Sequence, residues 1–376
     1  MYSIEEYSDC TWIDHTLLEQ FIQDIFVKLG TPPEEAAIIA DVLITSDKRG
    51  IDSHGIGRLK PIYIDRIDQG ILSPVTNIEV VNEGPTTAVL DGHNGMGHVV
   101  ARRAMEMAIA KARTYGTAMV AVRNSSHYGI AGYYAEMCAA ADMIGITGTN
   151  ARPSSAPTFG VENMLGTNPL TIGFPTDEPF AFNIDCATSM SQRGKIESYA
   201  RAGKKLPPGW VIDHDGQTQT DPETVLEALT KGNCALTPLG GIGEETAGYK
   251  GYGYATAVEV LSAALSNAKF TKDLNGTDAD GKRIPYPLGH FFIAVNIASF
   301  IEPALFKSIA GTIMRQLRAS RKAAGVRQIY TAGEKEWIAW QYRREHGIPV
   351  PPVLQEQLSA LNSRFDLNYQ FPWRRS

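Results

Sequence analysis

The feature of this sequence that most constrains its fold is an alternation of strand-like and helix-like segments in its middle part. Short apolar runs typical of strands lie at 87–90, 118–122, 143–147 and 180–184. Between them, residues 98–115 and 133–141 carry apolar side chains at helical spacing. This alternation predicts an α/β domain built around a substantial sheet. Farther along, the pattern predicts helices at 253–267 and 303–319 and a strand at 290–295.

The N-terminal part is predicted to be helical, and several other stretches are predicted to be irregular. One helix should end at Gly30, and Thr31-Pro-Pro-Glu34 has the form of a capping box that starts a second helix reaching about Lys48. The Pro-, Gly- and Asn-rich region 150–173 is predicted to be a long functional loop. Region 201–222 is polar and contains prolines, and the aromatic tail 349–376 is expected to wrap over the surface or a partner subunit.

Composition excludes several classes of function. The chain has 376 residues, enough for about two domains, and a net charge of −6 without a Lys- or Arg-rich block, so a nucleic-acid partner is not expected. No apolar run approaches the roughly 20 residues that span a bilayer. The first ten residues lack the basic start and apolar run of a secretory signal, which predicts a cytoplasmic protein. The four cysteines form no CxxC pair and no histidine pair has HExxH spacing, so thiols and no metal are expected.

Asp52-Ser-His-Gly-Ile-Gly-Arg58 places an imidazole four residues before a guanidinium. If Ser53 to Arg58 is helical, the side chains of His54 and Arg58 lie on one face. Histidine exchanges protons near neutral pH, and arginine binds a carboxylate through two parallel hydrogen bonds. The pair therefore suits a small acid whose neighbouring carbon gains or loses a proton. The alternative is a helix with one polar side, which spacing alone does not exclude.

A Rossmann-type dinucleotide site is not predicted. The segment closest to its glycine fingerprint, Gly95-Met-Gly-His-Val-Val100, has valine in place of the third glycine, and the acidic residue expected about 20 positions later is missing. Gly248-Tyr-Lys-Gly-Tyr-Gly253 is a better phosphate site, because three glycines and a lysine directly precede a predicted helix. The alternative is a tight turn with a solvated lysine.

Together, several segments of this sequence resemble the malate/L-lactate dehydrogenase family, whose nucleotide-binding fold is not of the Rossmann type. Relatives in that family include ureidoglycolate and sulfolactate dehydrogenases, diketogulonate reductases and piperidine-carboxylate reductases. The matching segments occur in the family's order and span most of residues 10–340: Asp47-Lys-Arg-Gly-Ile-Asp-Ser-His-Gly55, Asn124-Ser-Ser-His-Tyr-Gly129, Leu165-Gly-Thr-Asn-Pro169, Asn183-Ile-Asp-Cys-Ala-Thr-Ser189, Gly248-Tyr-Lys-Gly-Tyr-Gly253, Leu288-Gly-His-Phe-Phe292 and Tyr330-Thr-Ala-Gly-Glu334.

The resemblance implies an α/β fold with two parts. Residues 81–299 would form the central NAD(P)-binding and substrate part, and residues 1–80 with 300–376 a helical dimerisation part. It also implies NAD or NADP as the cofactor and a homodimer or higher homo-oligomer. Members move a hydride between the nicotinamide and C2 of a small 2-hydroxy or 2-oxo acid. Malate and oxaloacetate are the expected pair here, with lactate and pyruvate next.

The resemblance also implies roles for individual residues. His54 and His127 match acid–base positions, because oxidation of an alcohol needs a base for the hydroxyl proton. Which of the two transfers the proton stays open. Arg58 is expected to bind the C1 carboxylate, with Ser53 as a further donor. The positions that match cofactor contacts are Asp185, Cys186, Ala187, Lys250, Gly251, Gly333 and Glu334.

The sequence leaves the substrate group beyond C2 open. A cyclic imino acid, ureidoglycolate or sulfolactate oxidoreductase would carry the same motifs, and a catalytically inactive dinucleotide-binding protein is the alternative of another class. Two positions depart from the family's usual pattern. Cys186 stands where methionine is usual, and Ala151-Arg152 follows Asn150 where many members have a serine. Arg152 could favour a 2′-phosphate or a second substrate carboxylate, or be solvated.

Overall fold

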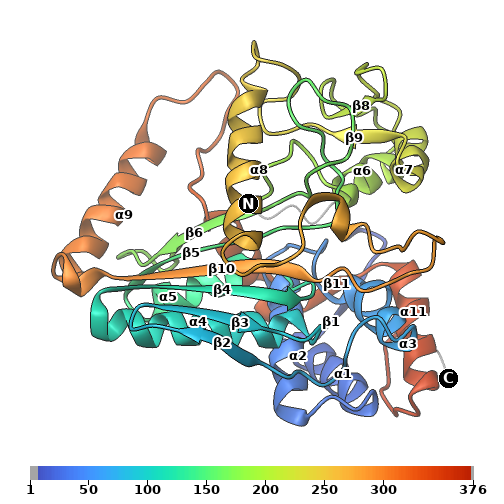
Figure 1. The fold of residues 1–376 in the computed structure, drawn as a ribbon, viewed down its shortest axis with the longest axis horizontal. Coiled ribbons are helices and arrows are strands. Elements are labelled where there is room, and N and C mark those ends of the chain that lie inside the picture. Colours follow the sequence, from blue (N-terminus) through green and yellow to red (C-terminus); the bar gives the residue numbers. More distant parts are fainter. Residues whose placement is uncertain (1–6, 374–376) are drawn as a thin grey trace.

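The computed structural model describes residues 7–373 and is centred on a mixed seven-stranded sheet (Figure 1). The strand order is β2-β3-β4-β10-β5-β6-β7, in which β3 and β4 are parallel and all other neighbours antiparallel. The strands are β2 Glu79–Glu83, β3 Thr87–Asp91, β4 Thr117–Ser125, β5 Met143–Thr149, β6 Leu170–Phe174, β7 Phe182–Cys186 and β10 Leu288–Asn296. The α/β class predicted from the sequence is confirmed.

Helices cover both faces of this sheet. Helices α4 (Gly97–Tyr115) and α5 (Gly132–Ala140) pack on one face, and α8 (Gly248–Ala263) lies on the other (Figure 1). Buried alanines of α4 recur at intervals of three and four, which lets the helix backbone approach β4 and β10 closely. The helix ends at Gly116, whose φ of 88° is readily adopted only by glycine.

Both ends of the chain build a second, helical region beside the sheet. It comprises α1 (His15–Lys28), α2 (Pro33–Lys48), α10 (Glu334–His346) and α11 (Pro352–Arg364). A short ladder also joins the ends, because β1 (Thr11–Ile13) pairs antiparallel with β11 (Ile348–Val350). One hydrophobic cluster contains Phe21 and Phe26 from the N-terminal end and Leu358 and Leu361 from the C-terminal end. The division into 1–80 with 300–376 and 81–299 stays a prediction.

A small third region lies between β7 and α8 in the sequence. It consists of α6 (Arg193–Arg201), α7 (Pro222–Lys231) and a two-stranded ladder of β8 (Val211–Asp213) with β9 (Cys234–Leu236). Its core includes Leu206 and Val211, so the stretch 201–222 is partly buried although its composition is polar. Helix α9 (Pro303–Ala319) follows β10 and has the bounds expected from the sequence.

At two places the structure differs from the local pattern that the sequence suggested. Residues 53–55 form turns and only Ile56–Arg58 is helical, as a single 3₁₀ turn (η2), so His54 and Arg58 do not share an α-helical face. Helix α2 has no capping box, because Pro32 occupies the N-cap position and moves Thr31 outside the helix. The Thr31 hydroxyl is buried without a hydrogen-bond partner among the described residues.

Two further predictions fail because secondary structure extends into them. Gly248–Gly253 forms the first turns of α8 and does not precede it; Ala247, with φ of 66°, is the N-cap. The end of the predicted loop 150–173 belongs to β6. The expectations about a leader at residues 1–6 and about the last three residues of the aromatic tail lie outside the described residues.

Candidate active site

His54 and His127, which are far apart in the sequence, lie face to face. His127 follows the end of β4, and His54 lies in the turn before η2. Their ring centroids are 5.9 Å apart and the ring planes differ by 16°. The Ser53 hydroxyl lies 2.8 Å from Nδ1 of His54. The fold therefore brings together the two imidazoles that the sequence predicted as acid–base groups.

Buried polar groups hydrogen-bond to the turn that carries His54 and fix its position. The Asp47 carboxylate accepts a hydrogen bond of 2.7 Å from the Ile56 backbone N–H. Gly55 is required there, because a Cβ atom would lie 1.9 Å from the Asp47 carboxylate. Arg343 of α10 is fully buried and donates to the Asp47 carbonyl and to the Asp52 carboxylate. The C-terminal helix thus fixes the position of the Ser53–Arg58 segment.

A buried tyrosine fixes the orientation of His127. The Tyr63 hydroxyl lies 2.6 Å from Nδ1 of His127 and 3.1 Å from Nε2 of His98. The Gly129 backbone N–H also points at His127 Nδ1, at 3.3 Å, so this nitrogen acts as an acceptor. A hydroxyl has one proton, so Tyr63 donates it to His127 and accepts from His98. Neutral His127 therefore carries its proton on Nε2.

Both facing imidazoles are neutral at pH 7. Burial, with a smaller contribution from the positive charge of Arg58, lowers the pKa of His54 to about 4. Burial also holds the pKa of His127 well below its usual range, with smaller contributions from His54, His98, Arg66 and Arg58. An anion bound at Arg58 would offset one of these positive charges and raise both pKa values. Binding of an anion at Arg58 would therefore be coupled to proton uptake by the two imidazoles.

Arg58 lies beside the imidazoles with much of its guanidinium unpaired. Its Nε donates to the Ser53 carbonyl, and no carboxylate lies within ion-pair distance among residues 7–373. The start of α6 approaches the other edge, because a Cβ atom on Gly194 would lie 3.3 Å from Nη2 of Arg58. The Nη groups can therefore form the two-pronged contact with a carboxylate. The sequence pattern did not reveal Gly194.

Asp185 lies on β7, the edge strand of the sheet, close to the loop that carries His127. Its carboxylate accepts hydrogen bonds from the Gly132 N–H (2.7 Å) and from the Thr171 hydroxyl (3.0 Å). Asn183, on the same strand, donates to the Gly132 carbonyl and to Glu136 of α5. Each Asp185 oxygen retains a lone pair after these contacts. Cys186 and Ala187 continue from Asp185 at the end of the strand.

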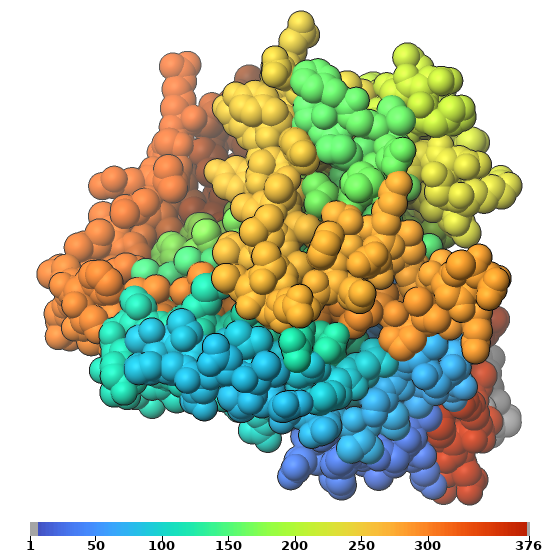
Figure 2. Space-filling model, viewed as in Figure 1, coloured from blue at the N-terminus to red at the C-terminus, as the bar shows by residue number. Residues whose placement is uncertain are grey.

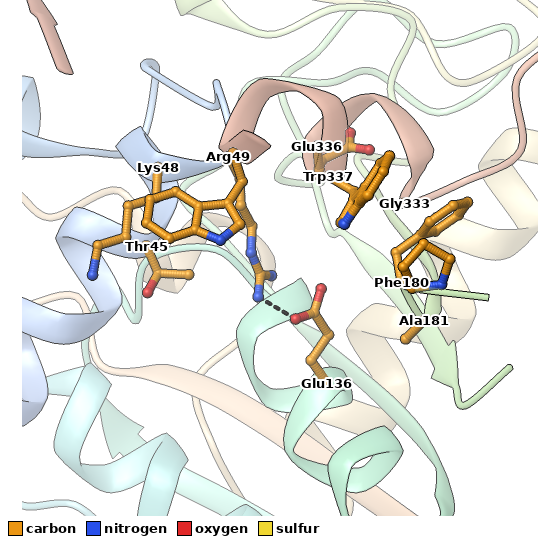
Figure 3. A pocket seen from close by; sticks show the side chains of 11 residues that line it. Thr45, Lys48, Arg49, Glu136, Phe180, Ala181, Gly333, Glu336 and Trp337 are labelled. Atoms are coloured by element: carbon orange, nitrogen blue, oxygen red, sulfur yellow. Dashed lines mark hydrogen bonds and ion pairs between the residues drawn. The ribbon is translucent and has the colours of Figure 1, made fainter. Parts of the chain in front are cut away.

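Gly333 and Glu334 lie near the start of the same strand, and Gly333 lines a pocket of about 360 Å³ (Figure 3). Gly333 has φ of 90°, and a Cβ atom there would lie 2.5 Å from the Ala181 carbonyl oxygen. The Glu334 carboxylate accepts from Arg318 and Thr331 and so anchors the segment. The pocket has aromatic walls and several charged groups, and its lining residues include Lys48, Arg49, Glu136, Phe180, Gly333, Trp337 and Trp340.

Lys250 and Gly251 lie in the first turn of α8. Gly251 contacts the Leu239 backbone so closely that a Cβ atom would lie 2.2 Å from the Leu239 carbonyl oxygen. Leu239 in turn donates to the Thr188 carbonyl, which connects this turn with Asp185–Ala187. The N–H groups of Gly248 and Lys250 already bond to the Gly243 and Ala247 carbonyls. The expected cradle of free N–H groups is therefore incomplete, and the exposed Lys250 ammonium is the group available to a phosphate.

Asn168 has a structural role. Its buried side-chain amide donates to the Ala255 carbonyl and to the Glu259 carboxylate, both in α8. Within the described part of the chain, no group of three or more His, Cys, Asp or Glu side chains is placed to hold a metal ion. No helix within residues 7–373 is long and apolar enough to cross a membrane.

Comparisons with known proteins agree with this geometry. The sequence profile described as malate/L-lactate dehydrogenase matches residues 13–359. A malate dehydrogenase of Pyrococcus horikoshii is 42% identical over 348 residues, which are 92% of this chain and 93% of that protein. An L-sulfolactate dehydrogenase of Methanocaldococcus jannaschii is 39% identical over 352 residues, 94% of this chain and 96% of that protein. The crystal structure of malate dehydrogenase from Entamoeba histolytica superposes with a TM-score of 0.93 at 42% identity, covering 96% of this chain and 100% of that one.

The fold and the paired imidazoles beside an arginine are those of a dehydrogenase that acts on CH–OH groups. The chain belongs to the malate/L-lactate dehydrogenase family, and the resemblance inferred from its motifs is confirmed.

Proposed function

We propose that this protein interconverts a 2-hydroxy acid and its 2-oxo acid, with malate and oxaloacetate as the first candidates and lactate and pyruvate next. The observation that carries the proposal is the pair of neutral imidazoles, 5.9 Å apart, beside the partly unpaired guanidinium of Arg58. Such a set can bind one carboxylate and serve the oxygen on the adjacent carbon. The relatives named malate and sulfolactate dehydrogenase support the same choice.

The protein's own groups divide the work in this proposal as follows. Arg58 binds the C1 carboxylate, with Ser53 as a further donor, and so directs C2 towards the imidazoles. His54 and His127 divide two tasks, which are taking the hydroxyl proton and hydrogen-bonding the C2 oxygen. Tyr63 keeps His127 Nδ1 occupied, so His127 can act on substrate only through Nε2. Burial of both rings excludes water and strengthens these interactions.

The family implies a nicotinamide cofactor, NAD or NADP, which supplies the hydride acceptor and donor when it is bound. We propose that the described residues hold such a group in three places: the end of β7, the segment beside its start, and the first turn of α8. Asp185 to Ala187 lie nearest the His127 loop and are proposed to hold a ribose. Gly333 lines a pocket whose rings could stack on a flat base, and Glu334 holds the Gly333 segment in place. Lys250 with Gly251 is proposed to contact phosphate.

Absorbance of the reduced nicotinamide tests the proposal directly. Oxaloacetate or pyruvate should oxidise NADH or NADPH when the enzyme is added, and His127→Ala should lower turnover by about 10²–10⁴. His214 is an exposed surface histidine, so the control variant His214→Gln should leave the rate unchanged. Turnover of a cyclic imino acid alone would place the protein in the imine-reductase branch. A chain that binds NADH but converts none of these substrates would be an inactive dinucleotide-binding protein.

We further propose that the protein is a homodimer and that α9, within the predicted dimerisation part 300–376, forms part of the interface. Four apolar residues of this helix, each about half exposed, form one stripe: Leu305, Ile309, Ile313 and Leu317. Figure 1 shows α9 standing at one side of the molecule. A continuous stripe of exposed apolar side chains usually marks a protein–protein interface. Light scattering should give twice the 41.0 kDa chain mass, and the double substitution Ile309→Glu with Ile313→Glu should reduce it to one chain.

A further inference from the structure

Arg66 is an arginine beside the catalytic histidines to which the family motifs assign no role. It lies in α3 (Asp65–Asp68), one turn after Tyr63, the residue that holds His127. Its guanidinium lies over the ring of Tyr286, 4.6 Å from the ring centroid. Figure 2 shows the segment that carries Tyr286, in orange, resting on the N-terminal part in blue. Arg66 and Ser126, the residue before His127, line the same small cavity, so the guanidinium lies close to the candidate active site.

The positive charge of Arg66 is not neutralised within the described residues. The two carboxylates of its own turn are already paired, Asp65 with Lys60 and Asp68 with Arg364. No acidic side chain of residues 7–373 lies within ion-pair distance of Arg66. A half-buried arginine normally has such a partner, because desolvation of an unpaired charge is costly. A partly buried guanidinium without a carboxylate partner can bind an anion from solution.

Two more arginines add to the positive charge around Arg66. Burial, with smaller contributions from the charges of Arg283 and Arg152, lowers the pKa of Arg66 to about 10. Arg283 donates to the neutral side chain of Gln69, and neither Arg283 nor Arg152 has a carboxylate partner among the described residues. Arg66 and the two arginines whose charges act on it therefore form a group of three cations without an acidic partner among the described residues. Arg58 lies in the same neighbourhood, and its charge and that of Arg66 both lower the pKa of His127.

We propose that Arg66 binds the second anionic group of the substrate, a carboxylate or sulfonate on C3, while Arg58 binds the C1 carboxylate. This inference rests on the proposed 2-hydroxy acid dehydrogenase function and names its substrate class as dianionic. The physical reason for selectivity is the unpaired charge of Arg66. A dianionic acid neutralises it, whereas the methyl group of lactate or pyruvate would leave the guanidinium desolvated and without a partner. Arg66 is thus a specificity-determining residue.

The test compares substrates that differ only at C3. For the wild-type enzyme and Arg66→Gln, kcat/KM is measured with oxaloacetate, 3-sulfopyruvate and pyruvate. Arg66→Gln should lower kcat/KM at least 100-fold for each dianionic substrate and change the pyruvate value less than threefold. The oxaloacetate and sulfopyruvate arms show which anionic group is preferred. Arg58→Lys should lower the values for all three substrates, and the exposed Arg103→Gln should change none.

Equal losses for pyruvate and the dianionic acids, or no loss for either, would overturn the assignment. Arg66→Lys keeps the charge and should retain part of the dianion preference, which separates a binding role from simple misfolding. Calorimetric titration with L-malate and L-lactate in the presence of NADH gives a readout that needs no turnover. Arg66→Gln should lose malate affinity and leave lactate affinity unchanged. If the wild type converts no 2-oxo acid, the proposed function fails, while the titration still decides whether Arg66 binds the second anion.

Discussion

The acid sensitivity of this fold can be predicted from one buried histidine outside the proposed active site. His290 of β10 is fully buried, with Nδ1 2.7 Å from the Thr149 hydroxyl and its ring stacked on Tyr128 at 4.5 Å. Burial lowers its pKa from 6.5 to about 3. The native state therefore keeps this ring neutral, whereas the unfolded chain takes up a proton below about pH 6.5.

The sign and size of the effect follow from proton linkage. Below pH 6.5 the unfolded state binds the extra proton, so the free energy of unfolding falls as the pH falls, until the native ring also titrates near pH 3. Each pH unit in this window costs about 1.4 kcal/mol. Between pH 7 and pH 5, about 1.5 pH units lie below pH 6.5, so protonation of His290 in the unfolded chain alone should lower the free energy of unfolding by about 2 kcal/mol.

Urea unfolding at pH 7 and pH 5, followed by circular dichroism, measures this cost. His290→Phe removes the titrating group and keeps an aromatic ring on Tyr128. The Thr149 hydroxyl can still donate its one proton to the Asn150 carbonyl oxygen, 2.7 Å away. The variant should lose about 2 kcal/mol less than the wild type between the two pH values. The exposed His214→Gln should behave as the wild type. Equal losses for His290→Phe and wild type would refute the reasoning.

Three further predictions concern single contacts. Arg58→Lys should raise KM for the 2-oxo acid at least tenfold with a smaller change in kcat, because lysine cannot make the two-pronged contact; an unchanged KM in steady-state assays would contradict a carboxylate clamp. Tyr63→Phe should lower kcat about tenfold and leave KM nearly constant, since it removes the 2.6 Å hydrogen bond that orients His127; an unaltered kcat would show that this bond does not matter. Thr31→Val should leave the free energy of unfolding unchanged or raise it by up to about 1 kcal/mol in urea titration, because the hydroxyl that it removes is buried without a partner among the described residues. A decrease of more than about 1 kcal/mol would indicate that the hydroxyl contacts water or a second chain.

The sequence predicted the sheet and its covering helices well, because these elements follow local periodicity. Helix α9 has the predicted bounds, and β4, β5 and α4 lie within three residues of theirs. The predictions were wrong where an adjacent residue or an adjacent helix changed the local structure. Pro32 took the cap position from Thr31, and the glycines at 248–253 entered the helix that they were expected to precede.

The candidate site could be predicted only in part. Motifs indicated His54, His127, Arg58 and Ser53, and the fold places all four together. The residues that position them gave no signal, because their contacts connect distant parts of the chain. Tyr63 reaches His127 and Arg343 reaches Asp52 across long sequence separations, as no spacing rule anticipates.

Sequence by itself determined the α/β class, the family and the set of candidate reacting groups, because periodicity and ordered motifs are properties of neighbouring residues. Tertiary structure alone decided their chemical state. Burial makes both imidazoles neutral, and the Tyr63 hydroxyl selects the tautomer of His127. The positive charge of Arg66 has no carboxylate partner among the described residues. The protonation state and the pairing of a group depend on the distant side chains that surround it and on its exclusion from water. Only the folded chain sets that environment.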